Sequence, residues 1–158
     1  MIRTYSKIAK LALLVIFLAI VPSTWVLAGG VNKLIATDSS GVAIKGYDTV
    51  AYFTEGRAVK GKEELEFVWQ DATWRFSKAA HRDMFAASPE RYAPKFGGHC
   101  AMGMSMNKKV AADPEAWTIV DGKLYMKRNK AARDRWRQDP ATRIKMAEDV
   151  WTELSKQN

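Results

Sequence analysis

The sequence predicts an α+β fold: a small single domain in which two antiparallel β-hairpins pack against short helices, with an amphipathic helix at the C-terminal end. Two hairpin patterns and one helical stripe support this prediction. Apolar and polar residues alternate over residues 65–76, interrupted by a short turn. A second pair of alternating segments, 117–120 and 123–126, flanks an Asp-Gly pair. The helical stripe follows near the C-terminus.

The second hairpin pattern is the stronger one. An Asp-Gly pair accommodates the positive φ angles of a two-residue type I′ turn, whose twist matches that of the paired strands. Pairing across this turn sets Ile119 opposite Leu124. It also sets Trp117 opposite Met126, so the hairpin is expected to present one apolar face.

Short helices are expected before and between the hairpins. Asp48 is placed to cap a short helical turn that Gly56 ends. Ser77 is placed to open a helix that runs through Phe85. Pro89 suits the first position of a further helical turn, because a backbone N–H at that position has no partner within the helix and proline lacks this N–H.

The C-terminal third of the chain is predicted to be helical. A helix starts after Asn129, breaks near residues 139–140 and then resumes. The resumed segment carries apolar residues at three- and four-residue steps, which form one stripe for docking on the domain: Ile144, Ala147, Trp151 and Leu154. Because no repeat, linker or low-complexity tract interrupts the chain before this stripe, the sequence indicates one domain.

Residues 1–28 have the pattern of a secretory signal peptide. Basic residues precede an apolar run over 11–21, and a small-residue exit ends at Ala28. Cleavage after Ala28 leaves residues 29–158 and predicts a periplasmic or secreted protein. An uncleaved N-terminal anchor is the alternative, and would be the only membrane attachment.

The charge of the chain argues against a nucleic-acid partner. The formal net charge is +8, and three of the basic residues lie in the predicted signal peptide, so about +5 remains after cleavage. Basic residues alternate with acidic ones along the rest of the chain, which gives no local basic groove.

A segment behind a Gly-Gly pair contains the strongest functional pattern. It holds five soft or borderline metal donors: His99, Cys100, Met102, Met104 and Met106. On a strand the cysteine and the three methionines share one face, whereas on a helix His99 aligns with Met102 and Met106, and Cys100 pairs with Met104. Glycines followed by small residues favour the helical alternative.

These donor types point to copper. Thiolate and thioether sulfur favour Cu(I), and imidazole binds copper and zinc alike. Cys100 is the only cysteine, so it forms no disulfide within the chain. The alternative is that the sulfurs fill the hydrophobic core, which is the commoner role of methionine and buried cysteine.

Several segments in order resemble the longer exported members of the YHS-domain family. The run Gly-Tyr-Asp-Thr-Val-Ala-Tyr-Phe occupies residues 46–53, and further matching segments follow at 74–77, 89–94, 96–101 and 113–125. The resemblance covers nearly all of residues 29–158. It implies a YHS-like domain with a C-terminal helical extension.

Compact YHS domains resemble metal knuckles with two cysteines, and the resemblance places those positions here. Phe76 matches the aromatic strand end, Ser77 the first cysteine and His81 the second. The positions after them match at Phe85, Pro89 and Tyr92. The pair of thiolates is not preserved, which leaves His81 as the candidate ligand. A chain that folds back at the Gly-Gly pair would bring His81, His99, Cys100 and one methionine together.

Three functions fit these observations. The first is an exported metal-binding protein, for copper, that works in periplasmic metal handling with a metal-delivery partner protein. The second is a small binding or structural module whose cysteine and methionines belong to the core. The third is a thiol-dependent enzyme with Cys100 as nucleophile and His81 or His99 as base. No complete catalytic constellation is visible, so the sequence predicts a protein that is not an enzyme.

Overall fold

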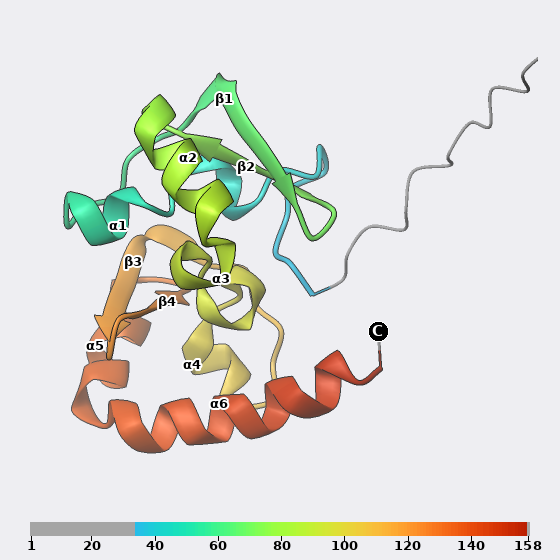
Figure 1. Ribbon diagram of the computed structural model, residues 1–158. Coiled ribbons are helices and arrows are strands. Elements are labelled where there is room, and N and C mark those ends of the chain that lie inside the picture. The colour runs from blue at the N-terminus through green and yellow to red at the C-terminus, as the bar shows by residue number, and fades with distance from the viewer. Residues whose placement is uncertain (1–33, 158) are drawn as a thin grey trace, which may run out of the picture.

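The computed structural model describes residues 34–157, so the predicted signal peptide and its cleavage site lie outside the described residues. The fold is α+β, as predicted, with two separate two-stranded antiparallel sheets and short helices around them (Figure 1). Among the described residues, no helix has the length and apolar character needed to cross a membrane.

The first half of the molecule is built on the hairpin of β1 (Lys62–Trp69) and β2 (Ala72–Phe76). The short helix α1 (Ala51–Thr54) precedes it. Helices α2 (Ala79–Ala87) and α3 (Pro89–Tyr92) follow it. Phe85 on α2 packs against the rings of Trp74 and Phe76, at 5.1 Å between centroids in both cases. Aromatic packing on α2 therefore forms the centre of this half.

The second half is built on the hairpin of β3 (Asp113–Val120) and β4 (Lys123–Lys127). Its register confirms the two cross-strand pairs predicted from the sequence. Asp121 and Gly122 have φ angles of 48° and 69°, the positive values that the predicted turn requires.

Three helices complete the second half: α4 (Ala101–Met104), α5 (Lys130–Gln138) and α6 (Pro140–Ser155). The long helix α6 runs along the base of the molecule, below α4 (Figure 1). Its apolar stripe packs, as predicted, on a second hydrophobic cluster that includes Tyr125 and Trp136, and Ala147 is fully buried there. Asn129 and Asp139 cap α5 and α6 by accepting hydrogen bonds from Ala132 and Thr142.

Strand β4 lies between two hydrophobic clusters. Leu124 and Met126 belong to the cluster that contains Trp74 and Phe85, whereas Tyr125 belongs to the cluster of α4, α5 and α6. Successive side chains of a strand point to opposite faces, so one strand serves both cores. The predicted apolar face is confirmed, because Trp117 and Ile119 pack against the cluster that holds Leu124 and Met126, and helices cover the other face of β4 as well.

The start of α2 differs from the prediction. The helix begins at Ala79 and its N-cap residue, Lys78, makes no capping hydrogen bond with its side chain. Ser77 instead donates to Asp48. Asp48 was predicted as the N-cap of the first short helix; the N-cap position is Val50, but Oδ1 of Asp48 does accept from the N–H groups of Val50 and Ala51 at 3.0 and 3.2 Å.

The Gly-Gly pair before His99 is set by a close backbone approach. A 3-10 turn, η2 (Lys95–Gly98), carries both glycines at positive φ. A Cβ atom on Gly97 would lie 1.8 Å from the carbonyl oxygen of Leu34, so no other residue fits without a shift of the backbone. This turn directs the chain into the segment that holds Cys100.

Candidate functional site

The first group of chemically active side chains surrounds Asp48, and we call Asp48, Thr54, Ser77 and His81 the Asp48 network. Oδ2 of Asp48 accepts from Nδ1 of His81 at 2.7 Å and from Oγ of Ser77 at 2.6 Å. The backbone N–H of Ser77 donates to the same oxygen at 2.8 Å. Nε2 of His81 contacts Oγ1 of Thr54 at 3.2 Å.

The Asp48–His81 pair at the centre of the Asp48 network is buried, whereas Ser77 is half-buried and Thr54 is exposed; the polar groups of the network are paired. Asp48 is 0% exposed and His81 is 5% exposed. Both ring nitrogens of His81 have partners, and the Thr54 hydroxyl donates onward to the carbonyl of Val50. A buried carboxylate with this many donors stabilises the fold, because each donor would otherwise lose its hydrogen bond to water. The arrangement has the Asp-His order of a catalytic triad, but it serves to tie α1, β2 and α2 together.

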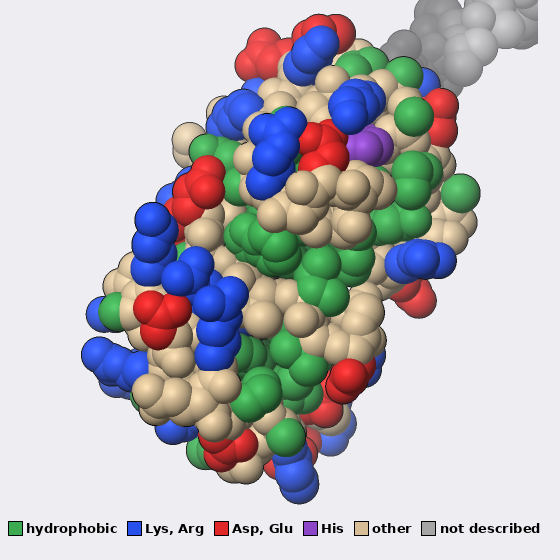
Figure 2. All heavy atoms as spheres, turned by 90° about the vertical axis from the view of Figure 1, so that its left-hand side faces the viewer, with side chains coloured by type: hydrophobic (Ala, Val, Ile, Leu, Met, Phe, Trp, Pro, Cys, Tyr) green, Lys and Arg blue, Asp and Glu red, His purple; other side chains and the backbone are tan. Residues whose placement is uncertain are grey.

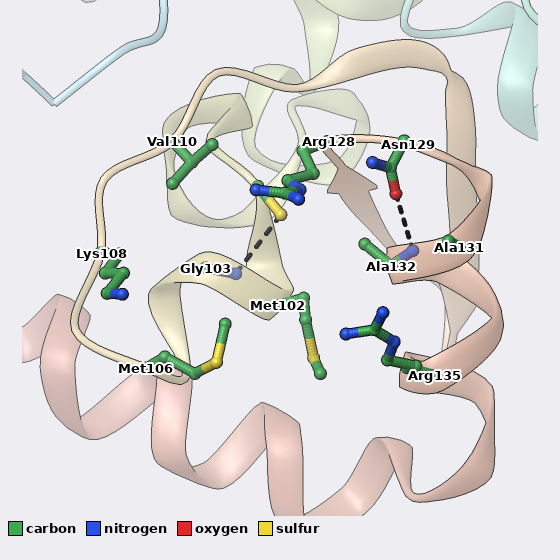
Figure 3. A pocket seen from close by; sticks show the side chains of 11 residues that line it. Met102, Gly103, Met106, Lys108, Val110, Arg128, Asn129, Ala131, Ala132 and Arg135 are labelled. Carbon is green, nitrogen blue, oxygen red and sulfur yellow. Dashed lines mark hydrogen bonds between the residues drawn. The ribbon is translucent and has the colours of Figure 1, made fainter.

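The second group lies around Cys100 in the other half of the molecule. Cys100 occupies the N-cap position of α4, where its Sγ accepts from the N–H of Gly103 at 3.3 Å. The residue is 1% exposed, yet it lines a pocket of about 210 Å³ between α4 and α5. We call this cavity the Cys100 pocket (Figure 3).

The Cys100 pocket gathers three of the predicted sulfur donors. Met102 and Met106 line it together with Cys100. Met104 is fully buried in the second core and is not among the lining residues. The helical alternative paired Cys100 with Met104, and the N–H of Met104 does donate to the carbonyl of Cys100 at 2.8 Å, with both residues in one hydrophobic cluster. Only Cys100 of this pair lines the pocket.

The two histidines are not part of the Cys100 pocket. His81 belongs to the Asp48 network, and His99 is absent from the pocket lining. Nε2 of His99 is buried without a hydrogen-bond partner, and burial together with the charge of Lys109 lowers its pKa to about 4. Among the residues that the structure describes, no three His, Cys, Asp or Glu side chains are grouped to hold one metal ion. The predicted meeting of His81 with Cys100 is therefore not seen.

Cationic side chains surround the sulfurs, an arrangement that was not predicted from the sequence. Arg128, Arg135 and Lys108 line the pocket, and no acidic residue does. Basic side chains also gather on the face of the molecule that contains α1 and α5 (Figure 2). Helical spacing could not have paired the arginines, because Arg128 precedes the extended N-cap Asn129 whereas Arg135 lies inside α5.

Lys127 adds a buried amine close to the pocket. It is 0% exposed, its Nζ donates to the carbonyl of Tyr125 at 3.0 Å and lies 4.6 Å from the ring centroid of Trp136. Burial lowers its pKa to about 7, and negative charge on Cys100 acts in the opposite direction. Its position follows from β4, since a residue two places after Tyr125 shares the face that packs on the helices.

The site cannot be assigned by likeness to known proteins. Comparison of the chain with protein-family models, with curated proteins and with solved structures found no significant match. The resemblance to YHS domains therefore stays a prediction, and the function has to be argued from the side chains of the site itself.

Proposed function

We propose that this chain is an exported YHS-type protein that binds one Cu(I) ion in the Cys100 pocket and takes part in metal handling. One observation carries the proposal: three sulfur-bearing side chains, Cys100, Met102 and Met106, line the same pocket. A thiolate with two thioethers is a soft donor set that suits Cu(I) and is poorly suited to Mg²⁺ or Ca²⁺.

The surroundings of the sulfurs agree with a monovalent ion of this kind. A thiolate and Cu(I) together carry no net charge, so the bound ion adds little repulsion to the arginines. A divalent cation would leave one uncompensated positive charge among them, which is unfavourable in a partly buried site.

A titration with a Cu(I) chelator as competitor tests the proposal on the purified, reduced protein. We expect about one copper ion per chain, and Cys100→Ser should weaken binding by several orders of magnitude, because a hydroxyl is a poor ligand for a soft cation. Met102→Leu and Met106→Leu should each weaken binding less, because each removes one neutral donor and keeps an apolar side chain of similar size.

Met104→Leu is the matched control. It makes the same chemical change two residues away, but in the core and outside the pocket. Its copper affinity should equal that of the wild type. Equal affinity of wild type and Cys100→Ser would contradict the copper proposal and favour the second candidate, a module in which these sulfurs serve as core. That candidate has its own support, since Cys100 and Met104 both belong to the second hydrophobic cluster.

Export is tested separately. We propose cleavage after Ala28, and mass spectrometry of protein from the periplasm or medium should find chains that begin at Gly29. An intact Met1 on most molecules would contradict cleavage and favour the N-terminal anchor.

A further inference from the structure

The cations of the Cys100 pocket have no partner within the described part of the chain. The side chains of Arg128, Arg135 and Lys108 form no ion pair or hydrogen bond there. Arg133, on the same helix as Arg135, contrasts with them because it pairs with Asp134 at 3.0 Å. The pocket cations therefore have free donors.

The three cations face one concave space. Arg135 extends from α5 toward the middle of the pocket, Arg128 projects above it, and Lys108 lies on the opposite side (Figure 3). The three side chains are exposed, and like charges around one concave space repel each other. An anion between them would remove the repulsion and pair with the free donors at once.

The walls of the pocket define the rest of the ligand. Met102, Val110 and Ala132 give the cavity an apolar side, next to the charged groups. A volume of about 210 Å³ is below the roughly 300 to 1,000 Å³ of sites for drug-sized ligands. The space therefore suits a small molecule with a short carbon chain and one or two charged oxygen groups.

We propose that the Cys100 pocket is a binding site for a small organic oxyanion, whose charged oxygens pair with Arg128 and Arg135 and whose carbon chain packs against Met102 and Val110. A guanidinium group presents parallel N–H donors that match a carboxylate or phosphate in a two-bonded arrangement. The proposal of an anion site does not depend on the copper proposal, because the anion would bind to the guanidinium groups of the pocket and not to a metal ion.

Calorimetric titration of the reduced full chain, with a copper chelator present, tests the proposal. Three probes distinguish the ligand chemistry: succinate, inorganic phosphate, and succinamide as the uncharged analogue of succinate. We expect saturable binding of succinate at one site per chain and no binding of succinamide. Stronger binding of phosphate than of succinate would assign the site to phosphate esters, and the proposal of an oxyanion site would stand.

Variants identify the pocket as the place of binding. Arg128→Gln and Arg135→Gln should each weaken binding by about tenfold or more, since a hydrogen bond to a charged group is lost. Arg137→Gln is the matched control, because it removes the same charge from the same helix outside the pocket lining, and its affinity should stay within about twofold. Equal losses in Arg135→Gln and Arg137→Gln, or no saturable binding of either anion, would overturn the proposal.

Discussion

The Asp48 network and the Cys100 pocket both combine residue types found in active and metal sites, but they differ in what their polar groups still lack. In the Asp48 network the carboxylate accepts five hydrogen bonds, and both nitrogens of His81 are engaged. In the Cys100 pocket three cations face a cavity without an acidic group. The polar groups of the Asp48 network already have partners, whereas the Cys100 pocket has the unpaired donors and the space that a ligand needs.

This difference shows why residue identity alone misleads. A buried Asp-His pair beside two hydroxyl residues invites a catalytic interpretation, yet here it joins segments that are far apart in the sequence. Unpaired donors around a cavity indicate binding more directly, because charged groups left without partners gain most from a new one. The contrast leads to four predictions, from the largest effect to the smallest.

Substitution in the Asp48 network should have the largest effect on stability. Asp48→Ala removes the acceptor of five hydrogen bonds and leaves His81 buried without its partner, so we expect a loss of about 3 to 5 kcal/mol in the free energy of unfolding. Asp38→Ala is the control, because the carboxylate of Asp38 accepts only from the N–H groups of Ser40 and Val42 near the surface. Its cost should be about 1 kcal/mol. Similar losses in urea unfolding would contradict the special role of Asp48.

Lys127 should make stability depend on pH near neutrality. Its pKa is about 7 in the folded chain against an ordinary value of 10.5, so the unfolded chain binds more protons between these values and stability rises with pH. We expect a rise of about 2 kcal/mol between pH 7 and pH 9. Lys127→Met keeps the apolar stem, should be more stable at pH 7 and should lose this rise. A parallel pH profile for both proteins would show that Lys127 stays charged when folded.

His99 should contribute a smaller change on the acid side. Its ring is neutral in the folded chain down to about pH 4, whereas an unfolded histidine takes up a proton below about pH 6.5. Stability is therefore lost as the pH falls through this range, by about 1 kcal/mol for a partly exposed ring. Thermal melts of wild type and His99→Gln between pH 7 and pH 5 measure the effect. The variant should show the weaker dependence, and an equal dependence would assign it to other groups.

The pocket arginines should have the smallest effect on stability. Arg128 and Arg135 are exposed and form no ion pairs in the described chain, so Arg128→Gln and Arg135→Gln should change the free energy of unfolding by less than about 0.5 kcal/mol. The same variants should lose anion binding. A marked loss of stability in either would mean that the arginines hold the fold together, and would remove the contrast with the Asp48 network.

Local patterns predicted much of the fold. The alternation of apolar residues located both hairpins, and the register of the second was correct at Ile119 and Trp117. The helix start after Asn129 and the break near residue 139 were also predicted, because a helix boundary depends on a few neighbouring residues. The prediction for Ser77 was wrong because it also used only neighbouring residues. A serine suits an N-cap position, but the hydroxyl of Ser77 donates to the carboxylate of Asp48, which is distant in the sequence.

The sequence alone determined the class of the fold, the hairpin turn at Asp121 and the presence of soft donors near Cys100, because these follow from spacing within one segment. Only the tertiary structure decided which donors share a space. In the folded chain His81 belongs to the Asp48 network and Cys100 to the Cys100 pocket. Met104 is buried in the second hydrophobic cluster, and Arg128 and Arg135 line the pocket together with the sulfurs. These outcomes depend on how the α4 turn, the end of β4 and the start of α5 pack together, and contacts between distant segments leave no periodic pattern in the sequence.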